Sequence, residues 1–165
     1  MNPLSHSSSH PVDDLESIAA LGNAWRDLRR GAAASSLRSK LFGEGESALD
    51  PGQVDTLDLL VEREFWRMGD LAEALRVDPS TATRAIQRLE KLELAERTTL
   101  ASDGRVVTVA VTSAGRARHN IITERRLKVM IKILSDFAPE DQAKLAQLLT
   151  QFVTSVDNVA STFEP

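Results

Sequence analysis

One stretch, from Asp78 to Gly115, limits the possible folds more than any other part of this chain. It reads DPSTATRAIQRLEKLELAER and, a few residues later, SDGRVVTVAVTSAG. Asp78 stands where it can cap the free amides of a first helical turn, and Pro79 stands where a missing N–H costs nothing, so a helix is predicted to begin here. The second run predicts a two-stranded hairpin. A helix followed at once by a hairpin is the pattern of a winged helix.

The predicted helix has two distinct faces. Its apolar side carries Ala82, Ala85, Ile86 and Leu89. On the other side, small hydroxyl residues let the helix end approach base edges, Arg and Gln match guanine or adenine with paired hydrogen bonds, and Lys meets phosphate. We therefore predict DNA binding by Ser80, Thr81, Thr83, Arg84, Gln87, Arg88 and Lys91. The alternative is a polar face that is only solvated.

The predicted hairpin turns at Asp103-Gly104, a dipeptide that favours the positive-φ positions of a tight turn. Val107, Val109 and Val111 alternate along its second strand and share one face. Arg105 would then lie at the tip, where an arginine enters the narrow minor groove beside the major groove that holds the helix. A solvated turn arginine is the alternative.

Composition excludes several classes of function. The chain has 165 residues, 42% of them hydrophobic and 27% charged, which is ordinary for a soluble globular protein. It has no cysteine, so disulfides, thiolate metal sites and thiol-based redox sensing are excluded. We expect a cytoplasmic protein without a membrane segment, because no export leader and no long apolar run is present.

The charge is unevenly distributed. The whole chain carries −4, but Arg76 to Arg118 holds eight basic and five acidic residues, a net charge of +3 that leaves −7 on the remainder. A basic DNA-reading surface on an acidic body is the interpretation we favour. Non-specific affinity for DNA should then be modest.

Four regions are predicted along the chain. They are a mobile tail (1–12), a helix of a dimerisation region (13–48), a winged helix-turn-helix lobe (49–112), and two further helices of the dimerisation region (113–162). The histidines, His6, His10 and His119, show no metal-ligand spacing, so neither a metal nor another cofactor is expected. Gly43 to Gly45 lacks the rest of a phosphate-binding loop and is predicted to be a linker.

The expected fold class is mainly α with a small β-hairpin. The first predicted elements are one helix from Asp13 to Leu41, a helix from Asp50 to Arg63 that starts with a capping box of Asp50 and Gln53, an extended piece from Phe65 to Met68, and a short helix from Asp70 to Val77. The helix that starts at Pro79 and the hairpin follow. The last two helices start at Thr112-Ser113 and Pro139 and run to about Phe137 and Thr162. The short join at Val77-Asp78 has helix-turn-helix spacing.

The outer helices carry more apolar residues than a small winged-helix core can cover. One stripe holds Ile18, Leu21, Trp25, Leu28 and Ala32, and another holds Leu145, Leu148, Leu149, Phe152, Val153, Val156 and Val159. We expect a symmetric homodimer in which these helices interlock and set two reading helices about one DNA turn apart, on a palindromic operator. The alternative is a helical hairpin folded onto its own lobe.

The chain resembles the MarR family of bacterial transcription regulators. The resemblance rests on LAEALRVDPSTATRAIQRLEKLELAER, on the Asp-x-Arg at Asp103 to Arg105, and on VTSAG before two long helices. It implies a dimeric winged-helix repressor of nearby genes that binds double-stranded palindromic operators and releases them when a small aromatic effector binds. By the same resemblance, Arg105 is the minor-groove arginine and Asp103 orients it.

The sequence departs from the family pattern at two positions. Glu93 stands where many members carry glycine, which predicts a differently shaped end of the reading helix, and Gly104 leaves Arg105 as the only basic residue at the wing tip. By analogy, Trp25, Arg29 and His119 would line an effector pocket, although Trp25 also fits core or dimer packing.

A different class of function remains open. A winged helix can keep its fold and use the polar face for another protein, which the acidic body would allow. An enzyme is not expected, because the sequence contains no nucleophile elbow, metal-ligand pair on a helix or complete phosphate loop.

Overall fold

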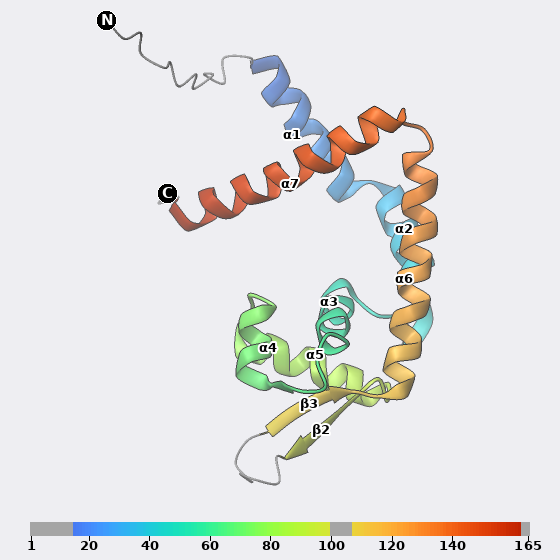
Figure 1. Ribbon diagram of the computed structural model, residues 1–165, viewed down its shortest axis with the longest axis vertical. Helices are drawn as coiled ribbons and strands as arrows, with labels where there is room; N and C mark the ends of the chain where they lie inside the picture. Colours follow the sequence, from blue (N-terminus) through green and yellow to red (C-terminus); the bar gives the residue numbers. More distant parts are fainter. Residues whose placement is uncertain (1–14, 100–106, 163–165) are drawn as a thin grey trace, which may run out of the picture. The chain divides into compact units, whose positions relative to one another are not determined.

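The computed structural model describes residues 15–99 and 107–162, apart from the side chains of residues 32–34 and of Thr99. The chain divides into two compact units, residues 1–49 and 50–165. In the first unit, α1 (Leu15–Arg30) and α2 (Ala32–Phe42) are followed by a 3-10 turn, η1 (Gly45–Ser47) (Figure 1). The predicted single helix from Asp13 to Leu41 is therefore two helices.

Gly31 makes this break. Its ψ of 138° leaves the helical region, and its N–H donates to the carbonyl oxygen of Asp27 at 2.7 Å. A Cβ at this position would stand only 2.8 Å from the same oxygen, so the close approach requires glycine. The apolar stripe continues past Gly31 in the sequence, which is why periodicity alone predicted one helix.

The second unit contains the winged helix and two long helices (Figure 1). Its elements are α3 (Pro51–Leu60), β1 (Trp66–Arg67), α4 (Met68–Ala74), α5 (Pro79–Lys91), β2 (Ala95–Thr99), β3 (Val107–Val111), α6 (Ser113–Leu134) and α7 (Pro139–Thr162). The fold class is confirmed: the chain is mainly helical, with a small antiparallel sheet in the order β1-β3-β2. Helix α4 begins and ends earlier than the predicted Asp70 to Val77.

The core of this unit lies among α3, α4, α5 and the sheet. Fully buried side chains come from each, including Leu57, Leu60, Leu71, Ile86, Leu89 and Val109. The indole N–H of Trp66 donates to the carbonyl of Leu59 at 2.9 Å, which ties β1 to the end of α3. The predicted apolar face of α5 is therefore confirmed as the face that packs. Of the three valines on β3, Val109 and Val111 are buried, whereas Val107 is exposed.

Helix α6 starts where the sequence predicted, since the hydroxyl of Thr112 accepts the N–H of Gly115 at 2.9 Å. Beyond its first turns, α6 buries only Ile122, and α7 buries no residue. Large apolar side chains on both helices and on α1 are exposed in the single chain. No helix in the described ranges is long and apolar enough to span a membrane.

Candidate DNA-binding site

The start of α5 is fixed by one carboxylate. Asp78 accepts the backbone N–H of Ser80 at 2.9 Å and that of Thr81 at 3.0 Å through the same oxygen, Oδ1. Two of the free amides of the first turn are thereby satisfied, and Pro79 has no N–H to satisfy. The predicted cap is confirmed. It anchors the helix end that we expect to approach DNA.

The same carboxylate also holds two side chains. The Ser80 hydroxyl donates to Asp78 Oδ1 at 2.5 Å, and the Thr81 hydroxyl donates to Oδ2 at 2.6 Å. These side-chain hydrogen bonds, with those from the two amides, hold the pKa of the Asp78 carboxyl well below its usual range. The backbone cap was predicted from the sequence and these side-chain hydrogen bonds were not, although Ser and Thr directly after an Asp-Pro cap were the available signal.

Beyond the first turn, the exposed face of α5 carries long polar side chains. Arg84, Gln87 and Lys91 are exposed and make no hydrogen bond or ion pair with other residues of the described ranges. Arg88 is half-buried, and its Nε is enclosed. The predicted reading face is thus present on one side of one helix, with Arg88 at its edge rather than at its centre.

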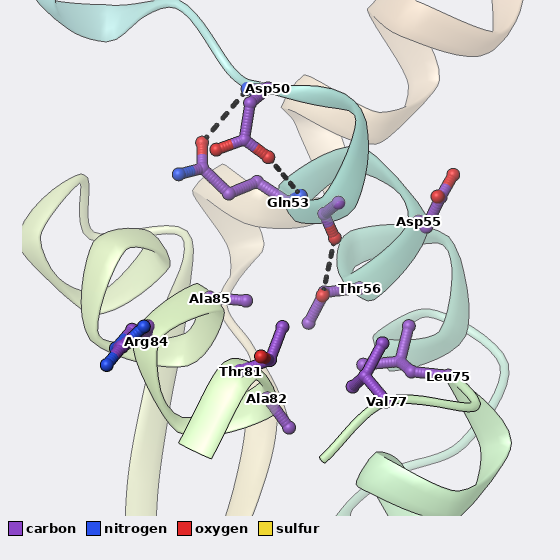
Figure 2. A pocket seen from close by; sticks show the side chains of 11 residues that line it. Asp50, Gln53, Asp55, Thr56, Leu75, Val77, Thr81, Ala82, Arg84 and Ala85 are labelled. Atoms are coloured by element: carbon purple, nitrogen blue, oxygen red, sulfur yellow. Dashed lines mark hydrogen bonds between the residues drawn. The ribbon is translucent and has the colours of Figure 1, made fainter. Parts of the chain in front are cut away.

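Figure 2 shows the groove between α3 and α5 from close by. Its cavity has a volume of about 250 Å³ and is lined by Gln53, Thr56, Val77, Thr81 and Arg84, among others. Two of the dashed lines mark the capping box of α3, in which Asp50 and Gln53 exchange hydrogen bonds of 2.9 and 3.1 Å, as the sequence predicted. The third marks the hydrogen bond that the Thr56 hydroxyl donates to the carbonyl of Gly52 at 2.7 Å. The Ala85 methyl points toward α3, whereas Arg84 points away from it.

The end of α5 is closed by a residue in an unusual conformation. Glu93 has a φ of 60°, in the left-handed region that favours glycine. The N–H groups of Glu93 and Leu94 donate back to the carbonyls of Glu90 and Leu89, respectively. These two hydrogen bonds are the pattern of a Schellman cap. The expectation that Glu93 changes the shape of this end is therefore wrong: glutamate adopts the conformation that the family's glycine favours.

The base of the wing is tied to α5 and across its own strands. Arg97 of β2 pairs with Glu90 of α5 at 3.4 Å, and the hydroxyls of Thr98 and Thr108 lie 3.0 Å apart across the β2–β3 pair. The predicted wing residues, Asp103, Gly104 and Arg105, lie outside the described residues, so their roles stay predictions. His6 and His10 also lie outside the described residues.

A cluster that the sequence argument missed joins α3 to α6. Asp58 accepts a hydrogen bond from Arg126 at 2.7 Å and lies 3.2 Å from Nε2 of His119. Burial, with the charges of Asp58 and Asp50, raises the pKa of the neighbouring Asp55, while Arg126 opposes the rise. The predicted ligand residues fall in different units: Trp25 and Arg29 in residues 1–49, and His119 in residues 50–165.

These features define the class of protein: a winged helix-turn-helix protein, with α4 and α5 as the helix pair and β2–β3 as the wing. Residues 49–107 match the model of the MarR family. A curated relative, the HTH-type transcriptional repressor MdtR of Bacillus subtilis, is 24% identical over 112 residues, which are 68% of this chain and 72% of MdtR.

Two solved structures have the same fold. FabT of Streptococcus pneumoniae in complex with DNA superposes with a TM-score of 0.73 at 18% identity, over 86% of this chain and 99% of FabT. PcaV of Streptomyces coelicolor in complex with its natural ligand gives a TM-score of 0.65 at 20% identity, over 94% of this chain and 99% of PcaV. At these identities the likeness shows the fold alone.

Proposed function

We propose that this chain is a dimeric, sequence-specific DNA-binding regulator that represses nearby genes. The observation that carries the proposal is the exposed face of α5, on which the side chains of Arg84, Gln87 and Lys91 make no hydrogen bond or ion pair with other described residues. Arginine and glutamine can bind guanine and adenine edges with two hydrogen bonds each, and lysine can neutralise phosphate. FabT, which has this fold, was solved with DNA, which supports the same role here.

Ser80, Thr81, Thr83, Arg84, Gln87, Arg88 and Lys91 are the proposed major-groove contacts. Arg105, with Asp103 beside it in the sequence, is the proposed minor-groove contact of the wing. Thr99 pairs with Val107 at the end of the described part of the β2–β3 pair, and these two residues precede and follow the segment that contains Asp103 and Arg105 in the sequence.

The proposed partner of the chain is a second copy of itself. Exposed apolar side chains recur on α1 at Leu21 and Trp25, and on α7 at Leu149, Val153 and Val156. Apolar faces of this extent are rarely left to water in a soluble protein, so their burial in a symmetric dimer is favourable. A dimer would read a palindromic operator.

Release by a small aromatic ligand is the proposed control. PcaV, which shares the fold, was solved with its natural ligand, which supports a ligand-responsive regulator. Trp25, Arg29 and His119 are the proposed ligand residues. For His119, the supporting observation is its place beside Asp58 and Arg126, where a bound anion would compete with Asp58 for the Arg126 guanidinium.

The test compares two single variants over a range of salt concentrations. Arg84→Ala should weaken binding to a selected operator by about 1–3 kcal/mol while changing binding to random DNA much less. Lys91→Ala should weaken binding to both DNAs alike and make affinity less dependent on salt. Equal losses on the two DNAs for Arg84→Ala would refute base reading by α5.

A protein-interaction module is the second candidate, favoured by the net charge of −4. The same salt series separates the two functions, because neutralisation of phosphates makes DNA affinity fall steeply as salt rises. A chain that binds no DNA at low salt supports the protein partner instead.

A further inference from the structure

The hydroxyl groups at the start of α5 have a fixed hydrogen-bond direction. A serine or threonine hydroxyl carries one proton to donate and two lone pairs to accept, whereas an ionised carboxylate only accepts. Asp78 Oδ1 lies 2.5 Å from the Ser80 hydroxyl, and Oδ2 lies 2.6 Å from the Thr81 hydroxyl. In both contacts the hydroxyl must therefore be the donor.

Asp78 accepts these hydroxyl hydrogen bonds over the whole range of pH in which a protein binds DNA. Four hydrogen bonds reach its carboxylate, two from side chains and two from amides. They lower the pKa of the Asp78 carboxyl, so the group stays ionised and remains an acceptor. The hydroxyls of Ser80 and Thr81 can therefore only accept hydrogen bonds from a ligand.

We propose that Asp78 sets the base preference at the start of the reading helix by turning the exposed Thr81 and Ser80 hydroxyls into hydrogen-bond acceptors. This inference rests on the proposed function and deepens it. In the major groove, cytosine N4 and adenine N6 donate, whereas guanine N7 and O6, thymine O4 and phosphate oxygens accept. The two hydroxyls therefore favour adenine or cytosine on the strand they face, and they do not bind phosphate.

Thr81 and Ser80 differ in a way that makes the inference testable. Oδ1 of Asp78 serves three donors, the Ser80 hydroxyl and both amides, while Oδ2 serves only the Thr81 hydroxyl. In an Asp78→Asn variant, the amide oxygen should therefore keep the Oδ1 position, and the NH2 group should take the Oδ2 position. Asparagine caps helices as well as aspartate does, so the helix start is retained.

Asp78→Asn should reverse the direction of the Thr81 hydroxyl alone. The new NH2 group donates to Thr81, whose own proton then points outward, while Ser80 still donates to the remaining oxygen. The base preference opposite Thr81 should change from adenine or cytosine to guanine or thymine. The preference opposite Ser80 should stay as it is and serves as an internal control.

The experiment selects bound sequences from random DNA with the unmodified chain, Asp78→Asn, Thr81→Val and the double variant. Competition between operators that differ at one position then measures each preference. We expect a roughly three- to tenfold preference opposite Thr81, the size of one hydrogen bond, reversed in Asp78→Asn and absent in both Thr81→Val variants. Asp78→Asn should also bind every sequence more tightly, because it removes a negative charge near DNA.

The possible failures are distinguishable. An unchanged base profile in Asp78→Asn, or a preference that survives Thr81→Val, overturns this inference and leaves the proposed function standing. An unmodified chain that enriches no sequence overturns the proposed function and the inference with it. Circular dichroism of each variant shows whether the helix start is intact, and the Ser80 position reports the same within the selection itself.

Discussion

The backbone N–H of Leu94 donates to the carbonyl oxygen of Leu89 at 2.8 Å, and this bond closes α5 around the left-handed residue Glu93. Leu89 and Leu94 are both buried, which agrees with the apolar contact that often accompanies a Schellman cap. Because a side chain strains the left-handed conformation, the cap is formed at a cost of about 1–2 kcal/mol. Packing of the two leucines thus holds the turn between the reading helix and the wing, although glutamate disfavours the left-handed conformation.

Glu93→Gly should therefore raise the free energy of unfolding. Relief of the left-handed strain exceeds the added entropy of the unfolded chain, so we expect a gain of about 0.5–1 kcal/mol. Chemical denaturation measures this change in the free energy of unfolding, provided that its dependence on denaturant concentration is the same in both proteins. Glu93→Ala is the matched control, because it removes the carboxylate but keeps the Cβ; a gain of the same size in that variant would show that strain is not the cause.

Gly115→Ala should be strongly destabilising. A Cβ at this position would lie 2.0 Å from the carbonyl oxygen of Leu94 and 2.7 Å from Cγ2 of Val111, and a backbone atom cannot move aside as a flexible side chain can. We expect a loss of about 3 kcal/mol, at the upper end for overpacking.

Gly69→Ala is the control for that experiment. Nothing lies within 4 Å of a Cβ added there, in the first turn of α4. Alanine should be neutral or stabilising by up to about 1 kcal/mol at this site. Similar thermal midpoints for Gly115→Ala and the unmodified chain would contradict the packing of α6 against Leu94.

Asp55→Asn should stabilise the protein at neutral pH and not in acid. Burial and the nearby Asp58 raise the pKa of the Asp55 carboxyl in the folded state, so its ionisation opposes folding above that pKa. The cost disappears as pH falls through the raised pKa and below the ordinary value near 4. We expect a gain of less than about 0.5 kcal/mol, because the site is largely exposed. A gain that persists at pH 3 would point to a cause other than charge.

Asp58 and Arg126 should be energetically coupled. Their atoms lie 2.7 Å apart between α3 and α6, and both side chains are partly shielded from water. A double-mutant cycle with Asp58→Asn and Arg126→Met should give a coupling of about 0.5–1.5 kcal/mol. A coupling near zero would mean that this pair does not hold α6 to the winged-helix lobe. The exposed pair Lys128 and Glu124, 4.0 Å apart, should give a smaller value.

The dimer should depend on the apolar face of α7. Leu149 and Val153 are more than half exposed in the single chain, so charges placed there should not disturb a monomer but should prevent burial against a partner. Sedimentation at micromolar concentration should show a dimer for the unmodified chain and a monomer for Leu149→Lys/Val153→Lys. Gln147→Lys, on the opposite side of α7, should remain dimeric. A monomeric unmodified chain would refute the proposed assembly.

Sequence patterns predicted the elements of this fold where the local signals agreed. Asp78-Pro79 marked the start of α5, Asp50 and Gln53 the start of α3, and Thr112 the start of α6, because capping is a property of adjacent residues. The break at Gly31 and the left-handed Glu93 were missed, because each depends on a backbone arrangement that hydrophobic spacing does not report.

Part of the candidate site was also predicted from the sequence. Helical spacing placed Arg84, Gln87 and Lys91 on one face of α5, and the structure confirms that this face is exposed. Spacing gave no sign that Asp78 holds the Ser80 and Thr81 hydroxyls. The contact of Asp58 with Arg126 joins residues far apart in the sequence, so no local pattern indicates it.

Selection of bound sequences from random DNA, with the unmodified chain and with Arg84→Ala, tests paired DNA reading most directly. The account predicts an inverted repeat with half-site centres about 10–10.5 base pairs apart, and a loss of preference at one position of each half-site in Arg84→Ala. Enrichment of no sequence, or of a single unrepeated site with the same profile for both proteins, would contradict it.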